Sequence, residues 1–473
     1  MIRYYVDVPV ELHARATHAL RLLLEGQGIV AAPASTAATA DLVYGPASNG
    51  TSGLHIAADT AHWDNRDRNL LATELVDPIA AAYFLAAGVW ESSRIKNEFG
   101  VPSLSRNGAG AQRLVQKPVV ARVSELLRRQ IQSSEESRNR QLEIVPRWPG
   151  GCVFAISLTH DVDRPFSRPT GEHYRARIRR YLAESDYAAA GRGVAGYIRN
   201  VIIAGDSGKR PEADPQFGFD TWMKAEEDLG IRSAFYIAVR GSAEPGTNRR
   251  DVYYNAAHPA IVAAIRNAVE RGFEVGLHAS ITCRDTPGFL AEERDRLSAL
   301  LGGQRVRGVR HHYLALDSAN PELTLAQHEH VGFDYDSSLG LNDAAGFRRG
   351  MAWPFRPFDR IRDVELGITE VPLTAMDMGI FRPDISPTQA IADLEAHIDV
   401  VQAAGGCAVI NWHLAQANPQ RLYGAGPSLL DVLARRMQSR AGEIWWATPS
   451  EIVDWWHIRR RQIFPEGEHV AVS

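Results

Sequence analysis

Apolar and polar residues alternate in blocks along the last two-thirds of the chain. Short apolar runs of strand length are separated by longer segments in which apolar residues recur at helical spacing. The runs predict strands at residues 152–160, 232–239, 273–278, 305–313, 369–375, 407–413 and 443–449. The segments between them predict helices, for example at 219–230, 263–272, 290–302 and 387–405. This order predicts parallel strands joined by crossover helices.

Over residues 151–460 the alternation favours a closed or nearly closed β/α barrel, with an open doubly wound sheet as the alternative. Residues 171–205 interrupt it between the first two strands. This segment has a helical period and is rich in Arg and Tyr. We therefore expect a helical insertion at about 170–210 that covers one mouth of the barrel.

Residues 1–131 predict a small N-terminal α/β domain. Its strands are expected at 4–10, 40–45 and 53–59, and its helices at 77–94 and 117–131. Residues 132–150 are polar and contain Pro and Gly, as is typical of a linker. The length of 473 residues agrees with two domains, because a single core stops growing at roughly 250–300 residues.

Composition excludes several classes of protein. The formal net charge of −4 gives no reason to expect nucleic acid as a partner. The three cysteines, Cys152, Cys283 and Cys407, form no CxxC pair, so neither a disulfide framework nor a structural zinc site is indicated. No apolar run approaches the ~20 residues that span a bilayer. The N-terminus does not resemble a signal peptide, and we expect a cytoplasmic protein.

Ionisable residues stand at the carboxyl ends of several predicted strands, which in a barrel meet at one mouth. They are His160, Asp161 and Asp163 at the end of the first strand, and then His278, Arg310, His311, His312 and His413. Two imidazoles and one carboxylate make a three-ligand site for a divalent metal such as zinc and leave positions open for water.

The two acids after the first strand suit different roles. Residues i and i+2 of an extended chain share a face, so Asp161 and Asp163 can both reach the mouth while Val162 packs away. One carboxylate can bind the metal, and the other can take a proton from water as a general base. A histidine on the opposite side can protonate the leaving group.

Four stretches make the chain resemble the polysaccharide deacetylases of carbohydrate esterase family 4, which share the chitooligosaccharide deacetylase homology domain. They are "LTHDVD", "RGFEVGLHAS", "GVRHHYLA" and "INWH". In "LTHDVD" the two acids stand as D-x-D, which resembles the form found in the peptidoglycan deacetylase and allantoinase-like branch of the family. The resemblance covers about residues 150–455 and implies a distorted (β/α)7 barrel. The chain most resembles a divergent subgroup with an extra N-terminal domain, often associated with surface-polysaccharide loci.

The resemblance also implies a role for each matching residue. Asp161 corresponds to the catalytic base and His413 to the catalytic acid. Asp163 and His278 correspond to metal ligands. Arg310 and Tyr313 correspond to the segment that shapes one wall of the substrate groove, and we expect both to contact substrate.

Two positions depart from the family's motifs. The second motif normally supplies another histidine four residues after the first, where this chain has Thr282. The third motif normally has proline where this chain has His312. We expect His312 to replace the missing metal ligand, with His160 as the alternative.

Further polar residues are candidates for substrate contacts. Arg348 and Asp336 lie in a segment rich in Asp, Ser and Gly, where hydrogen bonds that cap the loop are the alternative. Asp377 follows a predicted strand and is expected to contact substrate, to orient an active-site side chain or to cap a helix. For five tryptophans near the strands, packing is favoured over stacking on sugars: Trp412, Trp445, Trp446, Trp455 and Trp456.

These observations favour a metal-dependent hydrolase that removes N- or O-acetyl groups from a carbohydrate or sugar precursor. It would use one divalent metal ion, with Zn²⁺ expected. One alternative is hydrolysis of another C–N bond, as in the allantoinase-like relatives. Another is a non-catalytic protein on the same fold that binds or assembles carbohydrate. A cytoplasmic enzyme would meet lipid-linked or nucleotide-linked sugar precursors.

Overall fold

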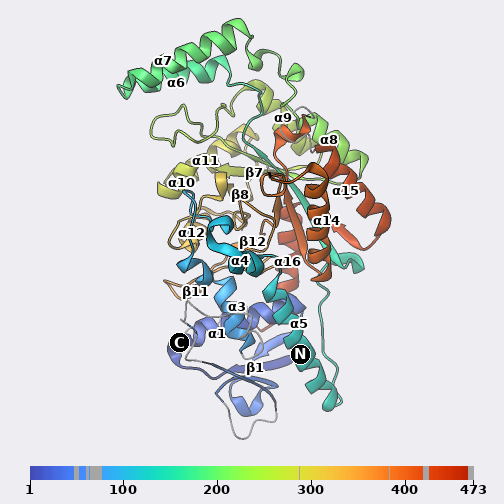
Figure 1. The fold of residues 1–473 in the computed structure, drawn as a ribbon. Coiled ribbons are helices and arrows are strands. Elements are labelled where there is room, and N and C mark those ends of the chain that lie inside the picture. The colour runs from blue at the N-terminus through green and yellow to red at the C-terminus, as the bar shows by residue number, and fades with distance from the viewer. Residues whose placement is uncertain are drawn as a thin grey trace.

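The computed structural model describes residues 1–46, 53–59, 63, 77–286, 288–382, 384–418 and 426–466. Two separate sheets of parallel strands organise this part of the chain. The smaller lies near both termini, and the larger fills the middle of the molecule (Figure 1). No helix among these residues is both long enough and apolar enough to cross a membrane.

The larger sheet is built from the strands that the apolar runs predict. It contains β5 (Phe154–Val162), β6 (Ala234–Ile237), β7 (Glu274–Ala279), β8 (Gly308–His311), β9 (Tyr335–Asp336), β12 (Thr369–Glu370), β13 (Ala375–Met376), β14 (Cys407–Asn411) and β15 (Ile444–Trp446). The order is β12-β9-β8-β7-β6-β5-β14-β13, with β15 beside the start of β5. The pairs in this order and the β15–β5 pair are parallel. All nine residues of β5 are buried, as expected for a strand covered on both faces.

A single extended segment closes this sheet. Its start, β12, pairs with β9, and its end, β13, pairs with β14 at the opposite end of the sheet. Between them the Val371 amide donates to the Asp336 carbonyl, and the Thr374 amide donates to the Val409 carbonyl. The fold is therefore a distorted (β/α) barrel, as the sequence predicted, and not an open doubly wound sheet.

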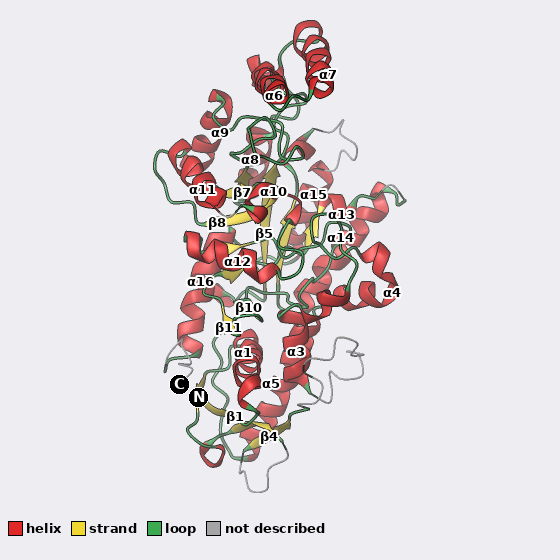
Figure 2. Ribbon diagram, turned by 90° about the vertical axis from the view of Figure 1, so that its left-hand side faces the viewer, coloured by secondary structure: helices red, strands yellow, loops and turns green. Residues whose placement is uncertain are grey.

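Helices cover the outside of the barrel (Figure 2). They are α8 (Phe219–Asp228), α9 (Pro259–Glu270), α11 (Gly288–Leu300), α12 (Pro321–Val331), α14 (Pro387–Ala403), α15 (Gly426–Ser439) and α16 (Pro449–Ile463). Helix α9 buries Ile261, Ile265 and Ala268, a spacing that puts all three on one face. Helix α16 starts with a capping box in which Thr448 and Glu451 bond each other's backbone amides.

The N-terminal residues form the smaller sheet, in the order β2-β1-β3-β4. Its strands are β1 (Ile2–Val6), β2 (Ala31–Pro33), β3 (Leu42–Gly45) and β4 (Leu54–Ala57). Helices α1 (Val10–Gln27), α3 (Pro78–Ala86) and α5 (Val119–Ser137) pack together. The strand predicted at 4–10 is shorter because α1 already begins at Val10. The boundary predicted at residue 131 lies inside α5.

The insertion after β5 is a helical hairpin. It consists of α6 (Gly171–Ala183), α7 (Tyr187–Tyr197) and a π-helical turn at Ile198–Ile203. The helices were predicted, but the position predicted for them, over one mouth of the barrel, was wrong. They project beyond α9 at one end of the molecule instead of lying across the barrel mouth (Figures 1 and 2).

A buried ion cluster fastens the N-terminal part to the barrel. Glu91 lies in a short 3₁₀ helix (Val89–Ser93), and both of its oxygens accept hydrogen bonds from Arg348, at 3.0 and 2.9 Å. Arg349 lies 3.1 Å from Glu91 and 2.8 Å from Glu322 of α12. Burial acts to raise the pKa of Glu91, but the two guanidinium groups lower it to about 2. Arg348 is thus engaged in an internal ion pair and does not line the cavity described below, where a substrate contact was expected of it.

Replacing Glu91 with Gln should destabilise the protein strongly. It leaves two buried guanidinium groups without the carboxylate between them, a loss expected to lower the free energy of unfolding by ~3–5 kcal/mol. Urea denaturation measures this. The exposed pair Arg440–Glu443 supplies the control, and Glu443→Gln should change stability by no more than ~1 kcal/mol. Equal effects of the two substitutions would contradict the structural role of Glu91.

Candidate active site

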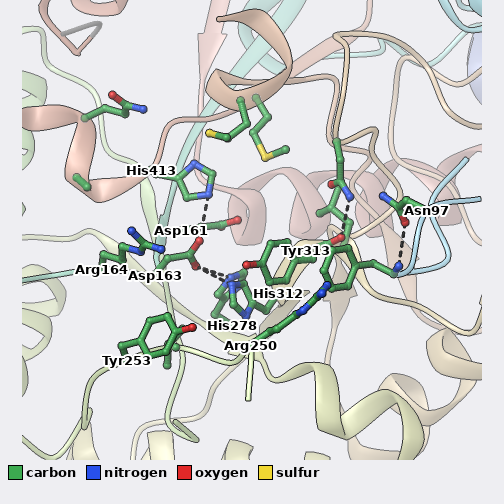
Figure 3. A pocket seen from close by; sticks show the side chains of 18 residues that line it. Asn97, Asp161, Asp163, Arg164, Arg250, Tyr253, His278, His312, Tyr313 and His413 are labelled. Carbon is green, nitrogen blue, oxygen red and sulfur yellow. Dashed lines mark hydrogen bonds and ion pairs between the residues drawn. The ribbon is translucent and has the colours of Figure 1, made fainter. Parts of the chain in front are cut away.

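A cavity of about 450 Å³ opens at the carboxyl ends of the barrel strands (Figure 3). Six of the predicted site residues line it: Asp161, Asp163, His278, His312, Tyr313 and His413. They come from the end of β5, from β7, and from the segments that follow β8 and β14. The parallel direction of these strands brings residues far apart in the sequence to one mouth.

Three of these side chains form a possible metal site. Asp163, His278 and His312 each offer one ligand atom, and the three atoms lie within 4.8 Å of one another. Asp163 Oδ1 is 3.1 Å from His278 Nε2 and 3.6 Å from His312 Nε2. Figure 3 shows both imidazoles pointing toward the carboxylate.

The hydrogen bonding around this cluster fits a divalent cation. His278 Nδ1 donates to the Arg310 carbonyl at 3.0 Å, which leaves Nε2 with a lone pair directed at the cluster. His278 Nε2 and Asp163 Oδ1 are buried, and within the described part of the chain neither forms a hydrogen bond. Burial acts to raise the pKa of Asp163, but His312, His278 and His413 hold it well below its ordinary value. A carboxylate with two imidazoles is a donor set suited to zinc.

The structure distinguishes the two candidates for the third ligand. His312 joins the cluster, and its Nδ1 lies 3.6 Å from Asp251. Thr282 is not part of the cluster. Its hydroxyl donates a hydrogen bond to Asp251 at 3.1 Å and so supports Asp251, the acid beside His312. Both nitrogens of His160 are engaged elsewhere, with the Trp412 carbonyl at 2.6 Å and Glu226 at 2.8 Å.

Asp161 is fixed beside the cluster by two buried side chains. Its Oδ1 accepts a hydrogen bond from Arg310 at 2.9 Å, and its Oδ2 accepts one from Asn411 at 2.8 Å. Burial acts to raise the pKa of Asp161, but Arg310 and His278 lower it below its ordinary value. Both interactions favour the ionised carboxylate.

Arg310 lies behind Asp161 and not in the substrate groove. It is fully buried, and its remaining donors bond Thr159 and Ser337. It is not among the residues that line the cavity. The substrate contact expected of Arg310 is therefore corrected: the residue positions Asp161.

His413 is oriented by Asp377. His413 Nδ1 lies 2.7 Å from Asp377 Oδ1, and the His413 amide donates to Asp377 Oδ2 at 3.1 Å. His413 Nε2 lies 3.4 Å from Asp163 Oδ2. Asp377 is fully buried at the start of α13 (Asp377–Ile380) and does not line the cavity. Of the roles expected for Asp377, the structure supports orientation of an active-site side chain.

Other candidates from the sequence lie in the protein interior. Asp336 is buried 3.0 Å from His328 and accepts hydrogen bonds from Ser338. Trp412 and Trp456 are buried, and Trp445, Trp446 and Trp455 pack against the core. None of these residues lines the cavity described above, in agreement with the packing role expected of the tryptophans.

The N-terminal part contributes a wall of the cavity that the sequence did not predict. Asn97 and Phe99 line the cavity, as do Tyr313, Arg250 and Tyr253 of the barrel part. The rings of Phe99 and Tyr313 are parallel, with centroids 4.1 Å apart. Tyr313 therefore takes the place in the cavity that was expected of it. No sequence signal links Phe99 to this site, because only the packing of the two parts brings it there.

Comparison with known proteins gives only distant likenesses. No protein-family profile and no curated protein matches the chain. A protein assigned as a polysaccharide deacetylase from Mycobacterium smegmatis is 17% identical, over 66% of this chain and 93% of that one, with a TM-score of 0.42. A polysaccharide deacetylase from Bacillus cereus is 10% identical, over 62% and 91%, with a TM-score of 0.30. A protein from Bordetella bronchiseptica, assigned as a polysaccharide deacetylase involved in O-antigen biosynthesis, is 15% identical, over 66% and 88%, with a TM-score of 0.28.

Replacing His312 with Gln should remove the third metal ligand. We expect the affinity for Zn²⁺ to fall at least about 100-fold, measured by competitive titration with a chelator and by elemental analysis of the purified protein. His330, on the exposed side of α12, supplies the control, and His330→Gln should leave zinc binding unchanged. Unaltered zinc affinity in His312→Gln would rule out His312 as a ligand.

Proposed function

We propose that this protein is a hydrolase that removes an acetyl group from a carbohydrate or sugar precursor, with a divalent cation held by Asp163, His278 and His312. The observation that carries the proposal is that two further groups, Asp161 and His413, are held at the same cavity by buried partners. The motifs that resemble the polysaccharide deacetylases support the choice of an acetyl group.

The positions of Asp161 and His413 suit the two proton transfers of acetyl hydrolysis. Asp161 accepts a proton from water as the water oxygen bonds to the acetyl carbon. The C–N or C–O bond then breaks, and His413 Nε2 gives a proton to the leaving nitrogen or oxygen. The products are acetate and a free amine or hydroxyl group. A bound cation would polarise the acetyl carbonyl and lower the pKa of water.

Buried partners prepare both groups for these roles. Arg310 and Asn411 occupy the two oxygens of Asp161 from the protein side, which holds the carboxylate at the cavity. Asp377 engages Nδ1 of His413 and so leaves Nε2 as the nitrogen available to the substrate. A catalytic group held in this way needs little rearrangement during the reaction.

Replacing Asp161 with Asn should separate catalysis from metal binding. The amide cannot take the proton of water, so kcat for acetate release should fall about 10²–10⁴-fold. Zinc content should stay unchanged, because Asp161 is outside the three-ligand cluster. Acetate release is measured on N- and O-acetylated sugars, with and without chelator. The exposed Asp384 supplies the control, Asp384→Asn.

The same measurements distinguish the other hypotheses. Loss of zinc from Asp161→Asn would contradict the separate roles of the two acids. Opening of a cyclic amide without acetate release would favour the allantoinase-like activity. Binding of saccharide with no hydrolysis by the zinc-loaded protein would favour a non-catalytic carbohydrate-binding role.

Replacing Phe99 with Ala should weaken substrate binding more than it slows chemistry. It removes the ring stacked on Tyr313, an interaction of about 0.5–1.5 kcal/mol. Because the ring also lines the cavity, its loss removes a similar amount of aromatic contact from a bound substrate, and we expect KM to rise between about 2-fold and 10-fold, with little change in kcat. Phe99→Tyr keeps the stacked ring and should behave like the original protein. An unchanged KM in Phe99→Ala would exclude the N-terminal wall from substrate binding.

A further inference from the structure

The hairpin formed by α6, α7 and the following π-helical turn is a well-packed element that stands out from the barrel (Figures 1 and 2). Helix α7 buries Ala189, Ala190 and Gly193, and small residues such as these let two helices approach closely. Arg180, near the end of α6 that leads into the turn, ties the hairpin to the barrel part through the Ser242 carbonyl at 2.6 Å and the Thr247 hydroxyl at 3.0 Å. The hairpin is thus fixed to the protein, although most of its surface faces outward.

One exposed side of α7 is apolar. Tyr187, Val194 and Ile198 are spaced seven and four residues apart, which places them on one helix face, and they are 71%, 44% and 47% exposed. Ile202 and Ile203 continue the surface at 65% and 77% exposure. We call these five residues the apolar face.

This concentration of exposed apolar residues is unusual for the molecule. Six of the seventeen large hydrophobic residues that are exposed in the described part of the chain lie within residues 182–203. Single exposed apolar residues are normal on protein surfaces, but a contiguous patch marks an interaction site. The described residues place nothing over the apolar face.

The charged groups around the apolar face are mostly unpaired cations. Four exposed arginines of the hairpin form no ion pair with any described residue: Arg175, Arg179, Arg192 and Arg199. The two acids at the turn between the helices are already neutralised. Glu184 pairs with Arg180 and Arg249, and Asp186 pairs with Arg249. The hairpin therefore offers positive charge beside apolar surface.

Exposed apolar residues flanked by arginines fit the boundary between headgroups and acyl chains of an anionic bilayer. A second copy of this chain fits less well, because a symmetric contact would bring the unpaired arginines of both copies together. We infer that the α6–α7 hairpin docks the protein on an anionic membrane surface, with the apolar face in the interface. This inference does not depend on the proposed hydrolase activity.

Vesicle flotation tests this docking. The probe is a set of vesicles made of phosphatidylglycerol and phosphatidylcholine, compared with vesicles of phosphatidylcholine alone. The full-length protein should float with the anionic vesicles and less with the neutral ones, and added salt should weaken the binding. The double variant Ile202→Ser, Ile203→Ser should bind the anionic vesicles at least about tenfold more weakly.

A matched control comes from the loop between β10 (Phe358–Asp359) and β11 (Val364–Glu365). Ile361 in this loop is 69% exposed but lies outside the hairpin. Ile361→Ser should bind vesicles like the original protein. The variant Arg192→Gln, Arg199→Gln should lose binding to anionic vesicles selectively, since it keeps the apolar face.

Three results would overturn the inference. The first is no flotation of the original protein, and the second is equal binding by the double isoleucine variant and Ile361→Ser. The third is that the original protein is a dimer in solution and the double isoleucine variant is a monomer, while neither binds vesicles. Acetate release from a water-soluble substrate should persist in the double isoleucine variant, so failure of docking and failure of the proposed activity are distinguishable.

Discussion

The convergence of three imidazoles on the carboxylate of Asp163 is the interaction on which the rest of the site depends. His278, His312 and His413 approach Asp163 at 3.1, 3.6 and 3.4 Å. They come from three parts of the barrel, and burial of so many polar groups is unfavourable unless each has a partner. A cation shared by Asp163, His278 and His312 would supply the partner that His278 Nε2 lacks within the described protein.

A layer of buried residues holds the groups around Asp163 in place. Arg310 and Asn411 support Asp161, and Asp377 supports His413. These partners come from β8, β14 and the start of α13, so the closing of the barrel determines the geometry of the site. The extended segment that joins β9 to β14 leads directly into Asp377. Closure of the sheet and orientation of His413 are thus produced by the same stretch of chain.

The N-terminal part contributes residues to the candidate active site. Its Glu91 is inserted between two buried arginines of the barrel part, and a few residues later Phe99 stacks on Tyr313 at the cavity. The ion cluster fixes the position from which the Phe99 segment reaches the cavity. A substitution in the ion cluster would therefore alter the cavity wall as well as the stability of the protein.

The sequence predicted the features that depend on local pattern. Alternating apolar runs and helical segments indicated the barrel, and the i, i+2 spacing of Asp161 and Asp163 indicated that both acids face the mouth. The replacement of the absent histidine at Thr282 by His312 was also expected, and the structure places His312 in the cluster. The barrel prediction is confirmed because strand direction and side-chain alternation are properties of neighbouring residues, while metal binding by His312 stays a prediction.

The sequence by itself determined the barrel class, the strands that carry the polar residues and the residue types available to bind a metal. Only the tertiary structure decided that Arg310 supports Asp161 from behind, that Arg348 binds Glu91, that Phe99 reaches the cavity and that the hairpin projects outward. Each of these depends on contacts between segments far apart in the chain. Such contacts depend on packing and on the pairing of buried charges. Neither produces a periodic pattern in the sequence.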